Sequence, residues 1–246
     1  MQAAESTAKR MSWPALCGIT LGLVLVALGI GVLFWGPLLY FSPRPFSLDD
    51  RVTLLYIVLG NQTGCLLVAL IRRTCSFRGF GNINANRPSI KGAPTQSWLR
   101  RTMPAAVLGT TLAVVLGVMY DMLLRGLFGN DAPTIGPWGA ARSLCPLAGG
   151  FIVALGVSLG PFADESFFRA GIFRAWADAG APRLGALVSS VLFALSRLDL
   201  VNFPAYVGLG LLLCAVYHRT GSLLAPLTMH ILLNAAMFVM LFSGYQ

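Results

Sequence analysis

Long uninterrupted apolar runs dominate this chain, and several reach about 20 residues, the length at which a helix crosses a bilayer. Of its 246 residues, 56% are hydrophobic and only 11% are charged, and the mean hydropathy is +0.73. A soluble domain carries roughly a quarter charged residues. The sequence therefore predicts an all-α fold, a polytopic transmembrane helical bundle.

Seven segments are apolar enough to be expected as membrane-spanning helices. They cover residues 15–40, 52–71, 104–128, 144–176, 184–198, 203–217 and 223–242. The first is too long for the apolar part of a signal peptide, so we expect it to be retained. We divide the chain into an N-terminal membrane anchor, residues 1–102, and a motif-bearing core, residues 103–246.

Basic residues gather in one segment between the second and third spans, which contains no acid and contributes much of the net charge of +9. They are Arg72, Arg73, Arg78, Arg87, Lys91, Arg100 and Arg101. Glycine, asparagine and proline in this segment predict an irregular loop. The positive-inside rule places the loop 72–101 in the cytoplasm near anionic lipid, and we expect no nucleic-acid partner.

The same rule gives an orientation for the whole chain. Lys9 and Arg10 place the N-terminus in the cytoplasm, and an odd number of spans then places the C-terminus outside. Because arginine greatly outnumbers lysine, as in GC-rich bacterial genomes, we expect the inner (plasma) membrane of a bacterium.

The centre of the second span has an unusual composition, Gly60-Asn61-Gln62-Thr63-Gly64. Small and amide residues at this depth favour close packing between helices. A functional polar site is the alternative interpretation of the same residues.

A polar cluster, Asp164-Glu165-Ser166-Phe167-Phe168-Arg169, interrupts the apolar C-terminal half. Charged groups at membrane depth are costly and are kept mainly where they form a site. Glu165 and Arg169 share a helix face, whereas Asp164 points about 100° away. Pro161 removes a backbone donor just before this cluster, so we expect a kink there.

Polar residues on three spans are predicted to lie at a common depth. At 1.5 Å per residue, Arg197 lies roughly 21 Å and Asp164 roughly 20 Å from the cytoplasmic ends of their helices. His230 lies roughly 12 Å and Asn234 roughly 18 Å from the cytoplasmic end of the last span. We therefore expect one buried polar layer, and the alternative is a set of ion pairs that only locks the helix packing.

Three motifs along the last four spans resemble the CPBP family of intramembrane proteases, which includes CAAX prenyl endopeptidases and the Abi group. The family pattern is Glu-Glu-x-x-x-Arg, then Phe-x-x-x-His, then His-x-x-x-Asn. The corresponding segments here are Asp164-Glu165-x-x-x-Arg169, Phe193-Ala194-Leu195-Ser196-Arg197, and His230-Ile231-Leu232-Leu233-Asn234 with Thr220-Gly221-Ser222 before it. The resemblance covers about residues 149–236.

The resemblance implies an endopeptidase whose first-motif glutamate and second-motif histidine activate a water molecule. It also implies that His230 and Asn234 stabilise the oxyanion. A carboxylate in a low-dielectric cavity is a usable general base, and a fixed donor aimed at the developing oxyanion lowers the barrier. The implied catalytic residues are thus Asp164, Glu165, Arg169, Arg197, His230 and Asn234.

Two positions depart from the family pattern. Asp164 keeps a carboxylate but has a shorter side chain than glutamate, and Arg197 replaces the histidine. Arginine stays protonated, so Arg197 cannot take a proton from water. Either Glu165 acts alone as base with Arg197 as an electrostatic clamp, or the chain is a pseudoenzyme that serves as a membrane scaffold or binds a partner protein.

The expected partner is a membrane-anchored or lipidated peptide substrate, or a partner membrane protein in the second case. Prenylated CAAX ends, sorting-signal tails and bacteriocin leaders are all compatible with the motifs. We expect no cofactor, because Arg197 would repel a divalent ion held by Asp164, Glu165 and His230. The five cysteines show no paired spacing, and a transporter is disfavoured because no internal repeat is visible.

Overall fold

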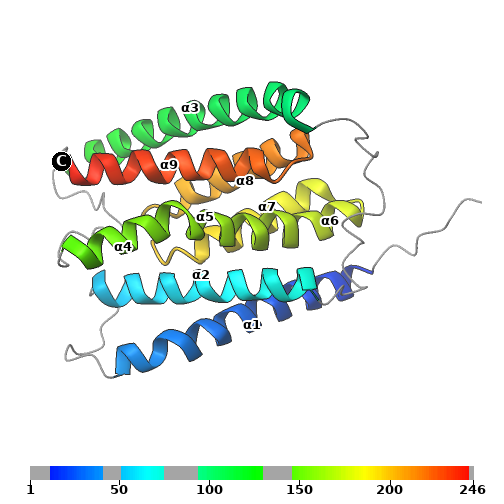
Figure 1. Cartoon of the computed structure of the whole chain (residues 1–246), viewed down its shortest axis with the longest axis horizontal. Coiled ribbons are helices and arrows are strands. Elements are labelled where there is room, and N and C mark those ends of the chain that lie inside the picture. Colours follow the sequence, from blue (N-terminus) through cyan, green and yellow to red (C-terminus); the bar gives the residue numbers. More distant parts are fainter. Residues whose placement is uncertain (1–11, 41–50, 75–93, 130–145, 244–246) are drawn as a thin grey trace, which may run out of the picture.

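The chain is helical throughout its described part (Figure 1). The computed structural model describes residues 12–40, 51–74, 94–129 and 146–243, and these residues contain no strand. The all-α prediction is therefore confirmed. Lys9, Arg10 and most of the basic segment, residues 75–93, lie outside the described residues.

Seven helical rods follow one another along the described chain. Three precede the motifs: α1 (Trp13–Tyr40), α2 (Arg51–Thr74) and α3 (Pro94–Phe128). The fourth is a composite of α4 (Pro146–Val157), α5 (Leu159–Asp164), the π-helical η3 (Glu165–Phe173) and α6 (Arg174–Asp178). The last three are α7 (Pro182–Leu195), α8 (Phe203–Thr220) and α9 (Leu224–Phe242).

The composite fourth rod lies in the middle of the bundle. In Figure 1, α3 and α9 run along one edge, α1 and α2 run along the opposite edge, and α4 to α6 run between them. Helix α2 packs on α5 and η3, and α7 packs on η3 from another side. Helix α8 packs against both α7 and α3. The motif-bearing segment is therefore surrounded by other helices.

Among the described residues, three helices are long and apolar enough to cross a membrane: Trp13–Leu33, Thr102–Phe128 and Gly149–Asp178. Shorter apolar helices cover Ile57–Ile71, Pro182–Leu195 and Leu224–Met240. Large apolar side chains are exposed along α1 and α3, with Leu33 76% and Leu108 71% exposed. Such surfaces suit contact with lipid, so the structure agrees with the predicted transmembrane bundle.

Gly64 of α2 and Gly31 of α1 allow these two helices to pack closely. A Cβ atom on Gly64 would lie 1.8 Å from the Ala27 carbonyl oxygen, and one on Gly31 would lie 2.6 Å from the Gly60 carbonyl oxygen. The helix backbones could not approach this far if these residues had side chains. The packing interpretation of this segment therefore agrees with the structure at Gly64, and Gly60 meets α1 through its carbonyl oxygen.

Two predicted boundaries were wrong. Helix α3 begins at Pro94, ten residues before the expected start at 104, so Arg100 and Arg101 belong to a helix and not to an irregular loop. Proline fits the first helical turn, and a helix can continue past the apolar run that marks the bilayer. Helix α7 ends at Leu195 and not near 198, which leaves Arg197 in the turn that follows.

Candidate active site

The two adjacent acids lie where an α-helix becomes a π-helix. Asp164 is the last residue of α5 and Glu165 the first of η3. The α-helical pattern is also interrupted at Ser158, six residues before Asp164. The kink expected near Pro161 stays a prediction. Short π-helical segments are rare and occur frequently at functional sites.

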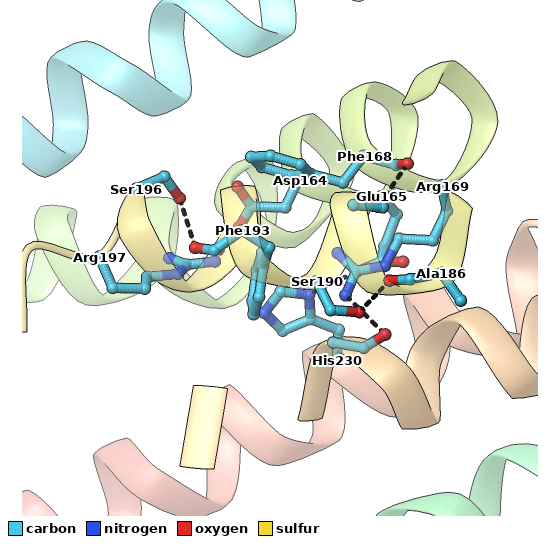
Figure 2. A network of polar contacts seen from close by, with 12 residues as sticks. Asp164, Glu165, Phe168, Arg169, Ala186, Ser190, Phe193, Ser196, Arg197 and His230 are labelled. Carbon is cyan, nitrogen blue, oxygen red and sulfur yellow. Dashed lines mark hydrogen bonds and ion pairs between the residues drawn. The ribbon is translucent and has the colours of Figure 1, made fainter. Parts of the chain in front are cut away.

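Glu165 is held through one of its two carboxylate oxygens. Its Oε1 lies 2.8 Å from Nδ1 of His230 on α9 and 3.2 Å from Nη1 of Arg169, one turn along (Figure 2). All three side chains are buried. The other oxygen, Oε2, has no hydrogen-bond partner among the described residues. Glu165 is thus fixed in place with one oxygen uncommitted.

Asp164 pairs with a different cation. Its Oδ2 accepts a hydrogen bond from Nη2 of Arg197, in the turn after α7 (Figure 2). Within the described chain, Asp164 Oδ1 and Arg197 Nε have no hydrogen-bond partner. The two carboxylates therefore address different partners, as the helical spacing predicts.

Phe193 on α7 lies at the centre of these groups. The guanidinium carbon of Arg169 lies 4.5 Å from the ring centroid, and that of Arg197 lies 4.4 Å from it. The His230 ring meets the same ring edge-on at 5.8 Å. The motif contains Phe193, but the sequence assigns it no role, because nothing in a sequence shows that two cations share one ring.

Helices α7 and α8 pack against η3 and hold it through hydrogen bonds. Arg169 Nη2 donates a hydrogen bond to the Gly210 carbonyl oxygen at 3.5 Å, and Ser189 Oγ donates to the Phe168 carbonyl oxygen at 2.9 Å. A Cβ atom on Gly210 would lie 2.7 Å from Cβ of Ser190, so α7 and α8 are in close contact there. The sequence alone does not single out Ser189, Ser190 and Gly210, because their importance arises from contacts with residues distant in sequence.

Asn234 does not join the acid network. It is half-buried, and its Nδ2 donates a hydrogen bond to the Gly156 carbonyl oxygen of α4 at 2.8 Å. The structure therefore brings together Asp164, Glu165, Arg169, Arg197 and His230 and leaves Asn234 as a contact between α9 and α4.

The charges of the network balance. Two carboxylates face two guanidinium groups, and His230 adds one imidazole. In the described part of the chain, no three His, Cys, Asp or Glu side chains gather as metal ligands would. The arrangement offers a fixed carboxylate, an imidazole and a guanidinium around one buried point, which are groups suited to hydrolysis by activated water.

Comparison with known proteins gives one family match. Residues 146–236 match the family described as type II CAAX prenyl endopeptidase Rce1-like. This range contains every residue of the buried network.

Two curated bacterial proteins are similar to the chain. The membrane-embedded CAAX protease MroQ of Staphylococcus aureus (strain USA300) is 26% identical over 215 residues, 84% of this chain and 83% of that protein. The "Putative membrane peptidase YdiL" of Bacillus subtilis (strain 168) is 29% identical over 82 residues, 33% of this chain and 34% of that protein. No solved structure matches the chain.

Proposed function

We propose that the chain belongs to the CPBP family of membrane CAAX proteases and is an intramembrane endopeptidase. Its substrate is a membrane-associated or lipidated peptide, and the nucleophile is a water molecule activated by a carboxylate. The single observation that carries this proposal is the state of Glu165, with Oε1 held by His230 and Arg169 and Oε2 uncommitted.

Glu165 is the proposed general base. As water attacks the peptide carbonyl carbon, Oε2 takes one water proton and the carbonyl oxygen becomes an oxyanion. When the tetrahedral intermediate collapses, the C–N bond breaks and Glu165 returns its proton to the leaving amine. Arg169 keeps the carboxylate oriented throughout, since both residues are fully buried.

His230 is the proposed donor to the oxyanion. Its Nδ1 is committed to Glu165, so Nε2 is the ring nitrogen left to face a substrate. The Glu165 carboxylate accepts a hydrogen bond from Nδ1–H, so Nε2 also donates only when the ring is doubly protonated. In this imidazolium form His230 donates a hydrogen bond from Nε2 to the developing charge. We assign Asn234 a positioning role, because its amide is committed to the Gly156 carbonyl and holds α9 on α4.

Arg197 is the proposed electrostatic clamp. The ion pair with Asp164 uses one of its nitrogens, and its buried Nε has no partner among the described residues. A guanidinium group has five N–H donors in a rigid plane, so it can hold an acid and a substrate carbonyl or carboxylate together.

A direct test uses the purified chain in proteoliposomes with a farnesylated CAAX peptide. We expect mass spectrometry to show two fragments whose summed mass exceeds that of the peptide by one water molecule. A peptide that stays intact with the wild-type chain, under conditions in which MroQ cleaves its own substrate, would contradict the proposal.

A second candidate function is favoured by the Asp164–Arg197 pair itself. A guanidinium in place of the second-motif histidine removes one proton acceptor, as expected of a pseudoenzyme that binds a partner membrane protein. That function predicts stable co-purification of a partner and no cleavage. The variant Asp164→Glu with Arg197→His, which restores the family pattern, would then create cleavage that the wild-type chain lacks.

The cellular setting is also part of the proposal. We place the chain in a bacterial inner membrane with its N-terminus in the cytoplasm and the basic segment 72–101 near anionic lipid. Support comes from the loop charges and from the two bacterial relatives.

A further inference from the structure

Helix α2 presents a polar side chain to the motif-bearing rod. Gln62 is only 6% exposed, and its amide nitrogen Nε2 has no hydrogen-bond partner among the described residues. An unpaired amide donor at membrane depth is unfavourable, because no bulk water is present to replace the missing partner. Such a group is expected to persist where a ligand supplies the acceptor.

The packing of α2 on α1 does not account for Gln62. At about 100° per residue, Gly64 lies roughly 40° around the helix from Gly60, on the same face. Gln62 lies roughly 200° from Gly60, on the opposite face. The two glycines meet α1, so Gln62 points away from that contact. The central amide of α2 therefore belongs to the opposite face, which packs on α5 and η3.

Gly160 makes the space that the amide occupies. A Cβ atom on Gly160 would lie 2.8 Å from Nε2 and 3.1 Å from Oε1 of Gln62. Gly160 lies four residues before Asp164, so both residues share one face of the helical rod. The amide thus lies about one helical turn from the Asp164 carboxylate.

Cys65 places the same face of α2 beside the ion pair. It follows Gln62 by three residues, is 1% exposed, and belongs to the same core as Phe193, whose ring centroid lies 4.4 Å from the Arg197 guanidinium carbon. Gln62 and Cys65 therefore form a wall of the site that the family match, which begins at residue 146, does not include.

From these contacts we infer that Gln62 is a substrate-binding residue whose Nε2 donates a hydrogen bond to a backbone carbonyl oxygen of the bound peptide. The inference rests on the proposed function in that the ligand is the peptide. It assigns to α2 a direct part in binding, beyond the predicted part as a membrane anchor. The carbonyl that Gln62 contacts is not the one that reacts, so its hydrogen bond is equally strong in the bound substrate and in the transition state. Gln62 therefore affects KM more than kcat.

The test measures peptide binding and cleavage separately, with the full chain in nanodiscs. Binding of a fluorescent farnesylated CAAX peptide is followed by anisotropy in a Glu165→Gln background, so that no turnover occurs. In that background Gln62→Met, which keeps the side-chain length but removes the donor, is expected to raise Kd about tenfold. In the otherwise wild-type chain the same substitution is expected to raise KM by the same factor and to leave kcat within about twofold.

Two further variants make the test specific. Thr63→Val removes a hydroxyl that bonds the Leu59 carbonyl oxygen within α2, and it is expected to leave Kd unchanged. Gly160→Ala should displace the amide and raise Kd as Gln62→Met does, and the two substitutions together should raise it no further.

Thermal unfolding separates a binding amide from a packing amide. Removing an unpaired buried donor is expected to leave the unfolding temperature of Gln62→Met unchanged or raised. An unchanged Kd with a lowered unfolding temperature would overturn the inference, as would a wild-type chain that does not bind the peptide. Binding that depends on Gln62 without any cleavage would support the inference and contradict only the proposed hydrolysis.

Discussion

Each buried charge of the site has an opposite charge beside it. Glu165 faces Arg169, and Asp164 faces Arg197, with all four side chains almost inaccessible. Removing one partner of such a pair leaves an uncompensated charge in a medium of low dielectric constant. The Asp164–Arg197 pair, where the sequence departs from the motif pattern, is therefore expected to contribute to stability as well as to chemistry.

A double-mutant cycle tests this expectation. We predict that Asp164→Asn or Arg197→Gln alone lowers the free energy of unfolding by about 3–5 kcal/mol, because each leaves one buried charge unpaired. The double variant should recover most of that loss. Reversible unfolding in detergent micelles measures the effect.

The exposed pair of Arg125 and Asp121, 2.8 Å apart, provides the control. Arg125→Gln should cost less than about 1 kcal/mol, because solvent screens exposed ion pairs. Additive losses in the buried cycle would show that Asp164 and Arg197 do not depend on each other.

At the level of single residues, the sequence predicts the acids, the histidine and the two arginines of the network. Helical spacing suffices for Asp164, Glu165, Arg169 and His230, which lie on helices, whereas Arg197 lies in the turn after α7. The same reasoning placed Asn234 with them, whereas its amide contacts Gly156. Spacing sets the face of a residue, but the acceptor that it reaches depends on how neighbouring helices pack.

Among the elements, the contact between α7 and α8 determines where Phe193 and Arg169 lie. Gly210 receives the Arg169 hydrogen bond through its carbonyl oxygen and leaves no room for a side chain against Ser190. A shift of α8 would therefore move the guanidinium that orients Glu165.

Two alanine substitutions on α8 test this contact. Gly210→Ala is predicted to lower the free energy of unfolding by about 1–3 kcal/mol, because its Cβ would overlap Ser190. Gly208→Ala meets nothing within 4 Å and should raise stability by up to about 1 kcal/mol, as alanine does in an open helix interior. Thermal unfolding of both variants gives the comparison, and equal effects would contradict the proposed contact.

Element positions were largely predictable and element ends were not. The apolar runs place seven helices where the structure has them. The early start of α3 at Pro94 lies outside any apolar run, and the π-helical segment η3 has no known sequence pattern. Among the element ends, that of α7 at Leu195 affects the site most, because it leaves Arg197 in a turn. Leu198 in the same turn has a φ of +52°.

For the whole molecule, the helices enclose the motif-bearing rod on several sides. Phe167, Phe168, Ile172 and Trp176 from that rod share one core with Leu16 of α1 and with Cys65 and Val68 of α2. The division into an anchor, residues 1–102, and a core, residues 103–246, stays a prediction. The shared core leads us to expect that the first two helices influence the site.

Membrane orientation is a prediction for the whole chain. Two single-cysteine variants of a cysteine-free chain test it: Leu200→Cys, at a residue 83% exposed after α7, and Arg219→Cys, at an exposed residue ending α8. In spheroplasts, a membrane-impermeant maleimide should label position 200 directly and position 219 only after permeabilisation, as the positive-inside rule requires. The reverse pattern would contradict the proposed orientation.

The central claim is that the uncommitted oxygen of Glu165 activates water, and the initial rate of peptide cleavage by Glu165→Gln tests it most directly. Asp121→Asn is the matched control, since Asp121 pairs with Arg125 one turn away at 2.8 Å but on an exposed surface. We predict that Glu165→Gln lowers the rate at least about 100-fold, as loss of a general base does, and that Asp121→Asn leaves it unchanged. Cleavage by Glu165→Gln at the wild-type rate would contradict the account.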